Sequence, residues 1–220
     1  MAELRRRGIL LQCAAIPARP PPVVVARWLA LLPARQGAGS SPGSPDPAAT
    51  ITGLALLASC ARAWPGAPPL LQLAREPGGR PHWPGGPSFS IAHAAGHAVC
   101  ALAAPDLAIG VDLEADGATE LARLRLVTTA AERRAVAAGQ LDAVALWTSK
   151  EAVLQAAGAD LRQVARVEID GCLGHHADRI WYLQQMEPAP GLRLALASSV
   201  PMAPLRVTWP DGACLLDQNR

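Results

Sequence analysis

Two carboxylates have a spacing that could place them at one binding site. Asp112 and Glu114 occupy alternate positions of the segment IGVDLE, residues 109–114, and a strand would point both side chains to one face. The two residues would then lie about 7 Å apart, close enough for both to bind one hard cation. A solvated strand face has the same pattern, so the pair alone leaves both interpretations open.

A helical segment, LWTSKEAVLQAAG at residues 146–158, supplies a third carboxylate. Trp147, Glu151 and Gln155 recur at every fourth position and share one side of the predicted helix. Lys150, beside Glu151, is the single lysine among the 20 Lys and Arg residues of the chain. It could bind an anion, or its stem could cover apolar surface while its amine reaches solvent.

Two histidines and an arginine are further candidates for binding. His93 ends the segment SFSIAH and His97 begins HAVCALA, so both should flank one tight turn. A zinc site would need a third ligand that this spacing does not supply, and two exposed hairpin histidines fit equally well. Arg80 precedes Pro81 in an irregular loop rich in Gly and Pro.

The elements that must position these residues follow from the apolar patterns. The predicted strands are residues 8–16, 69–76, 88–93, 97–103, 107–114, 164–169, 179–186, 192–200 and 204–209, of which those between 88 and 114 should form an antiparallel meander. The predicted helices are residues 23–33, 48–64, 119–139 and 141–158. We therefore expect an α+β protein with an N-terminal part, residues 1–104, and a C-terminal part, residues 105–220. A Gly/Ser/Pro-rich loop at residues 36–47 should be mobile.

Composition excludes several classes of function. The formal net charge is +2 and no long basic run occurs, which argues against a nucleic-acid partner. No apolar run approaches the roughly 20 residues of a membrane helix, so we expect no membrane partner and a cytoplasmic location. The five cysteines are odd in number and scattered, which indicates neither a disulfide framework nor a zinc site.

Four short motifs occur in an order that resembles a known enzyme family. They are GGRP (78–81), SIAH (90–93), IGVDLE (109–114) and WTSKEA (147–152). Together they resemble the surfactin-synthetase-activating type of 4'-phosphopantetheinyl transferase, in its Trp/Lys-Glu-Ala subgroup. The match spans residues 78–158, and the flanking regions agree only in size and order of elements.

The resemblance implies an activity, a fold and a set of site residues. The enzyme would transfer the phosphopantetheine arm of coenzyme A to a serine of an apo acyl or peptidyl carrier protein, releasing adenosine 3',5'-bisphosphate. It would be a monomer of two pseudo-symmetric subdomains, each a small antiparallel sheet packed with helices, with the cofactor in the cleft between them. By motif position, the Mg²⁺ ligands would be Asp112, Glu114 and Glu151. The catalytic residues would be Glu151, Glu114 and Lys150. The residues that contact coenzyme A would be Arg80, Pro81, His93, Asp112, Lys150 and Gln155. The general base would be Glu151, or Glu114 acting through a water.

The chain also departs from the family pattern. Gln155 stands where the family commonly has a second lysine near the diphosphate, and alanines flank His93 in place of hydroxyl residues. The loop at residues 37–47 replaces the usual basic cluster for the 3'-phosphate, with Arg62, Arg75 and Arg35 as candidate substitutes. Two alternatives thus stay open: a catalytically weakened relative that binds coenzyme A or a carrier protein, and an unrelated α+β domain.

Overall fold

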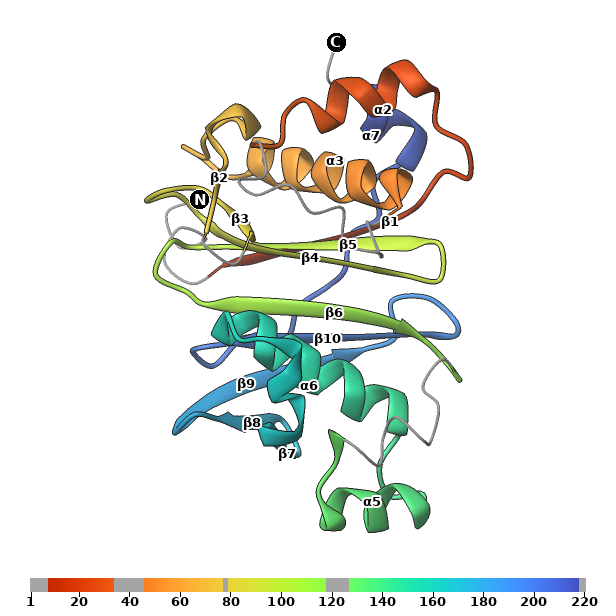
Figure 1. Cartoon of the computed structure of the whole chain (residues 1–220), viewed down its shortest axis with the longest axis vertical. Coiled ribbons are helices and arrows are strands. Elements are labelled where there is room, and N and C mark those ends of the chain that lie inside the picture. The colour runs from red at the N-terminus through yellow and green to blue at the C-terminus, as the bar shows by residue number, and fades with distance from the viewer. Residues whose placement is uncertain (1–7, 34–45, 77–78, 118–126, 218–220) are drawn as a thin grey trace.

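The computed structural model describes residues 8–33, 46–76, 79–117 and 127–217 (Figure 1). It combines antiparallel sheets with several helices, which confirms the predicted α+β class. The strands are β1 (Ile9–Ala15), β2 (Ala74–Arg75), β3 (Pro81–His82), β4 (Ser88–Ala94), β5 (His97–Ala103), β6 (Ile109–Ala115), β7 (Glu168–Asp170), β8 (Leu173–His176), β9 (Arg179–Met186) and β10 (Leu192–Ser198). The helices are α2 (Pro22–Leu29), α3 (Pro47–Ala63), α5 (Ala130–Ala137), α6 (Ala143–Ala157), α7 (Gly212–Asp217) and the 3-10 helices η1 (Leu70–Gln72) and η2 (Leu161–Arg166).

The first sheet has the strand order β1-β5-β4 and is covered by helix α3, and helices α2 and α7 pack on α3 (Figure 1). Helix α3 begins at the N-cap Asp46, whose side chain accepts the Ala48 N–H, and nearly all of its middle turns are buried. Gly53 lets this helix approach the sheet closely, because a Cβ there would lie 2.7 Å from the Ile91 Cγ2. The apolar core of this half forms between α3 and the sheet.

The second sheet has the order β6-β10-β9-β8-β7, and helix α6 packs against it (Figure 1). Helix α6 runs from its N-cap Asp142 to Gly158, which ends it in the left-handed conformation with φ of 64°. This agrees with the predicted helix and its glycine stop. The helix is buried on most sides, as expected for one that carries apolar residues around much of its circumference.

The predicted meander is wrong at its third strand. Strands β4 and β5 pair around a tight turn, as expected, but β6 pairs with β10 and lies beside β4 (Figure 1). Ile109, Val111 and Leu113 on β6 pack into the core of the first sheet, whereas Gly110 contacts α6. Strand β6 is therefore buried between the two halves, and local alternation could not indicate which strand would become its partner.

The end of the chain returns to the first sheet. The predicted strand at residues 204–209 is replaced by one parallel bridge, in which the Cys13 N–H donates to the Thr208 carbonyl over 3.0 Å. Helix α7 follows, and its Leu216 carbonyl accepts from the buried Trp28 indole at 3.1 Å. Residues 208–217 thus pack on the N-terminal half, although the predicted boundary assigns them to the C-terminal part.

Several local predictions also differ from the structure. Residues 69–76 form η1 and the short strand β2 in place of one strand, and residues 164–169 are divided between η2 and β7. Strand β8 lies in a segment predicted as a loop, where His175 pairs with Glu168. Of the helix predicted at 119–139, α5 forms within the described residues, while 118–126 lie outside them, as do 34–45 of the predicted mobile loop. None of the helices in the described part of the chain has the length and apolar character of a membrane span.

Candidate functional site

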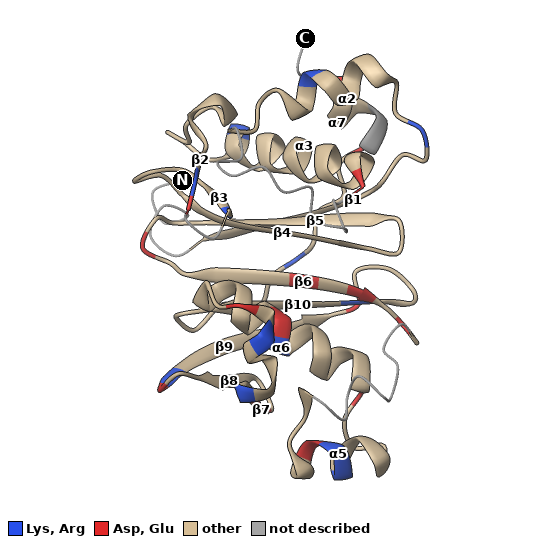
Figure 2. Ribbon diagram, in the orientation of Figure 1, with Lys and Arg blue, Asp and Glu red and all other residues tan. Residues whose placement is uncertain are grey.

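The three predicted acids lie on two elements that pack in direct contact. Asp112 and Glu114 are on β6, and Glu151 is on α6; Figure 2 shows acidic positions on both elements. Gly110 permits the contact, because a Cβ at this position would lie 2.2 Å from the Ala152 carbonyl oxygen and 2.3 Å from the Ala156 nitrogen. The small residue in the Gly-Val-Asp motif therefore brings the acid-bearing strand against the acid-bearing helix.

Asp112 is the most buried of these acids, with 6% of its surface exposed. Its Oδ2 atom has no hydrogen-bond partner among the described residues. The pKa of Asp112 is raised well above its usual value, first by burial and then by the charges of Glu151 and Glu114, while the Leu113 N–H opposes the shift. A buried carboxylate oxygen without a donor is costly, and a cation would relieve that cost.

Glu151 has the second strongly perturbed carboxyl group. Burial and, to a smaller extent, the charge of Glu114 raise its pKa from 4.5 to about 7. A carboxylate with such a pKa accepts a proton near neutral pH more readily than an ordinary glutamate. The negative charges of the three acids therefore disfavour one another, and the Glu151 shift has the direction predicted for an acid close to two others.

The donor set of this cluster suits a hard divalent cation such as Mg²⁺. All candidate ligands are carboxylate oxygens, and the unpartnered Asp112 oxygen is the clearest sign of a missing positive partner. Across the described residues, however, no three His, Cys, Asp or Glu side chains are arranged to hold a metal ion. The charges and the chemistry of the acids fit the ion, whereas their side-chain geometry does not form a closed ligand set.

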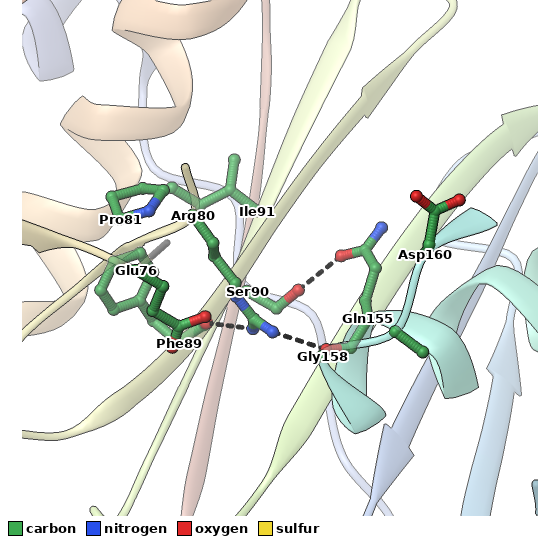
Figure 3. Close-up of a pocket in the computed structure, with 10 residues that line it drawn as sticks. Glu76, Arg80, Pro81, Phe89, Ser90, Ile91, Gln155, Gly158 and Asp160 are labelled. Carbon is green, nitrogen blue, oxygen red and sulfur yellow. Dashed lines mark hydrogen bonds between the residues drawn. The ribbon is translucent and has the colours of Figure 1, made fainter. Parts of the chain in front are cut away.

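A pocket of about 460 Å³ lies beside the end of α6, and Arg80 forms one of its walls (Figure 3). The Arg80 guanidinium donates to the Gln155 carbonyl at 2.6 Å, the Phe89 carbonyl at 3.0 Å and the Ile109 carbonyl at 3.5 Å. Burial lowers the Arg80 pKa, and the charge of Glu76 opposes this effect. Arg80 therefore connects β4, β6 and α6, and Pro81 lies next to it in the pocket wall.

Ser90 also lines this pocket and was not predicted as a site residue. Its hydroxyl donates to the Gln155 Oε1 at 2.7 Å, as Figure 3 shows. The same hydroxyl accepts the Val111 N–H at 3.1 Å. Gln155, predicted to contact coenzyme A, thus directs its side-chain oxygen to Ser90. The available sequence signal was a hydroxyl residue that begins the SIAH motif on the same strand face as the buried Ala92.

His93 lies apart from this pocket, near the turn between β4 and β5, where its side chain is exposed. The turn brings His97 to the start of β5, as predicted. The His97 Nδ1–H donates to the Ala95 carbonyl at 2.9 Å, and the His97 ring packs edge-on against Trp209. The two histidines therefore have different surroundings, and His93 is the one exposed to solvent.

The predicted role of Lys150 in binding coenzyme A is not supported, because its side chain is fully buried. It forms an ion pair of 2.9 Å with the Glu132 Oε2 and donates to the carbonyls of Val127 at 3.1 Å and Val167 at 2.5 Å. These three partners match the three N–H donors of an ammonium group. In this arrangement Lys150 contributes no donor to a phosphate, and its amine does not reach solvent, so both sequence-based interpretations are wrong.

Of the three arginines considered as substitutes for the missing basic cluster, the structure describes Arg75 and Arg62. Arg75 donates from Nε to the Pro33 carbonyl at 3.0 Å and from Nη1 to the Gly79 carbonyl at 2.6 Å. Arg62 lies in the last turn of α3 and is not free of partners. Arg35 lies outside the described residues, as does Gly78 of the first motif.

Comparisons with known proteins do not assign the chain to a family. No model of a known protein family matches it. A search of curated proteins finds no similar sequence either. An assignment of function must therefore depend on the residues themselves and on how the fold arranges them.

The raised pKa of Glu151 predicts a pH-dependent stability in the absence of metal. Between its ordinary pKa of 4.5 and the raised value of about 7, the folded protein binds more protons than the unfolded chain. The free energy of unfolding should therefore fall as the pH rises through this window, by on the order of 1 kcal/mol for each pH unit. Urea denaturation in EDTA, comparing the wild type with Glu151→Gln, measures this slope.

The difference between the two proteins contains the titration of Glu151 and the effect of its charge on Asp112. Asp112 adds a slope of the same sign, because its pKa is also raised, and this slope should be smaller in Glu151→Gln, because the charge of Glu151 contributes to the Asp112 shift. The curve for Glu151→Gln should consequently be flatter between about pH 4.5 and pH 7. Parallel curves for the two proteins would contradict the pKa shift.

Proposed function

We propose that the protein is a Mg²⁺-dependent 4'-phosphopantetheinyl transferase that modifies a serine of an apo acyl or peptidyl carrier protein with coenzyme A. The observation that supports this most directly is the packing of β6 on α6, which places Asp112, Glu114 and Glu151 near enough for their charges to interact. The buried Asp112 oxygen without a partner and the raised pKa of Glu151 are the properties expected of such a site without its metal.

Each acid would have a defined role in the reaction. Asp112, Glu114 and Glu151 would hold Mg²⁺, which when bound supplies positive charge to the diphosphate. Glu151, or Glu114 through a water, would take the proton of the carrier serine as its oxygen bonds to phosphorus. The bond from phosphorus to the departing adenosine 3',5'-bisphosphate then breaks, and the proton remains on the carboxylate.

The binding of coenzyme A would extend from the acids toward the Arg80 pocket. Arg80 and Pro81 form its wall from the first half of the chain, and Gln155 forms part of it from α6. A pocket with residues from both halves supports the proposed cleft between them. We also propose that the two halves are pseudo-symmetric subdomains and that the protein is a monomer. Lys150, in contrast, would connect α6 to the residues packed beside it and not contact the cofactor, because its three N–H donors are used by Glu132 and two carbonyls.

A second candidate function is binding of coenzyme A or a carrier protein with weak or no transfer. The observation that favours it is that the side chains predicted to supply positive charge are already paired or are replaced by a neutral residue. Arg80 donates to three backbone carbonyls, Lys150 is fully paired, and Gln155 replaces the family's second lysine. The diphosphate would then meet less positive charge than in a typical member of the family.

One experiment separates these functions. The purified protein is incubated with coenzyme A, Mg²⁺ and a panel of apo carrier proteins, and each carrier is analysed by intact mass spectrometry. We expect the mass increase of one phosphopantetheine on at least one carrier, and its loss when EDTA removes the metal. Calorimetric binding of coenzyme A without any carrier modification would support the second candidate, and neither binding nor transfer would contradict both.

A further inference from the structure

The side chain of Ser90 on β4 contacts both acid-bearing elements through its single hydroxyl. It lies on the buried face of β4, with 3% of its surface exposed. Its Oγ accepts the Val111 N–H of β6 at 3.1 Å and donates its own hydrogen to the Gln155 Oε1 of α6 at 2.7 Å. The hydroxyl therefore acts as a donor toward α6, as Figure 3 shows, and as an acceptor toward β6.

The two bonds end close to the acids on each element. Val111 immediately precedes Asp112 on β6, so the bond restrains the backbone from which this acid projects. Gln155 lies four residues after Glu151, on the same side of α6 and one turn along the helix. The Ser90 hydroxyl therefore restrains the positions that carry a proposed metal ligand on both elements.

The Ser90 link matters for the position of β6 because no backbone ladder joins β6 to β4. Strand β4 is at the edge of the first sheet and β6 at the edge of the second, so their backbones are not joined in a common ladder. A shift of β6 along β4 is restrained instead by side chains, through Ser90 at Val111 and through Arg80 at Ile109. The Arg80 contact is the longer one, at 3.5 Å against 3.1 Å for Ser90.

We propose that Ser90 is a positioning residue that sets β6 and α6 at the separation required for Asp112, Glu114 and Glu151 to bind a divalent cation together. This inference rests on the proposed function, because it assumes that the acids bind a metal. It assigns Ser90 no contact with the metal itself. The hydroxyl acts through the Val111 peptide and the Gln155 amide, as outer residues do when they orient metal ligands.

The test measures metal binding without coenzyme A, because Ser90 also lines the pocket and could affect the cofactor directly. Mn²⁺ serves as the probe, and electron paramagnetic resonance measures the free ion during titration of the wild type. Ser90→Ala should bind Mn²⁺ roughly tenfold or more weakly, the range typical of lost outer contacts. Ser90→Thr keeps the hydroxyl and should retain most of the affinity.

Ser199→Ala is a matched control. The Ser199 hydroxyl accepts the Ala108 N–H at 3.2 Å, immediately before β6, but its described contacts do not reach the acids or Gln155. This variant removes a comparable hydrogen bond from the entry to the strand. It should therefore bind Mn²⁺ with the affinity of the wild type. A loss equal to that of Ser90→Ala would overturn the specific role of Ser90.

Gln155→Leu tests the same link from its other end and decides the matter if Ser90→Ala does not fold. It removes the acceptor of the Ser90 hydroxyl without altering a proposed metal ligand, so Mn²⁺ affinity should again decrease. Wild-type affinity in Ser90→Ala, or in Gln155→Leu when the serine variant is unfolded, would refute the inference while leaving the metal site intact. Absence of Mn²⁺ binding by the wild type would instead count against the proposed function.

Discussion

Glu151→Gln is expected to lower the rate of phosphopantetheine transfer by about 10²–10⁴-fold, the usual contribution of a positioned general base. The amide keeps the size of the side chain but cannot accept the serine proton, and it is a poorer ligand for Mg²⁺. Burial and the neighbouring Glu114 raise the Glu151 pKa to about 7, which suits it to proton transfer near neutrality. Intact mass spectrometry of the carrier over time measures the rate.

A companion variant and a control define this prediction. Asp112→Asn removes the buried carboxylate and should weaken Mn²⁺ binding as well as transfer, without unfolding the protein, because it also removes a costly buried charge. Glu168→Gln changes an exposed acid on β7 and should leave the transfer rate unchanged. Near wild-type transfer by Glu151→Gln would show that this residue neither accepts the proton nor binds an essential metal.

Lys150→Met is expected to lower the free energy of unfolding by about 3 kcal/mol. The buried Glu132 would lose its ion pair, and the carbonyls of Val127 and Val167 would lose their donor. The cost should be at the lower end for a broken buried pair, because Glu132 also accepts the N–H groups of Thr129 and Ile169. Urea denaturation at neutral pH measures the change.

Two further variants identify the cause of that loss. The double variant Lys150→Met with Glu132→Gln should recover part of the stability, because it removes the unpaired charge while keeping a hydrogen-bonding side chain in the capping box of α5. Lys150→Arg should be destabilising, because a planar guanidinium does not fit three acceptors placed around a compact ammonium. Stability of Lys150→Arg equal to the wild type would contradict this explanation for the single lysine.

The comparison variant for this ion pair is Arg162→Ala. Its pair with Asp160 is similar in length, at 3.0 Å, but the arginine side chain is 90% exposed. Solvent weakens such a pair, so little change in stability is expected. The contrast would show that burial of Lys150, and not pairing alone, makes it important for the fold.

Local sequence patterns were sufficient for the elements that carry the site. The long apolar helix α3, the helix α6 with its Gly158 stop and the strand β6 formed near their predicted positions, because each depends on nearby residues. The alternation in IGVDLE correctly indicated that Gly110, Asp112 and Glu114 share a face. Periodicity was less informative in short segments that contain or follow a proline. Residues 69–76 and 204–209 were each predicted as one strand and do not form it.

The sequence by itself thus determined the α+β class, the strand and helix that bear the acids, and the face on which each acid lies, because these depend on the repeat of the backbone. Only the tertiary structure decided that β6 pairs with β10, that Lys150 pairs with Glu132, and that Ser90 connects β6 to α6. These contacts join residues far apart in the chain, and their energies depend on burial that no local pattern contains. The single lysine illustrates the difference: its motif suggested a cation for phosphate, whereas packing made it the buried partner of a carboxylate.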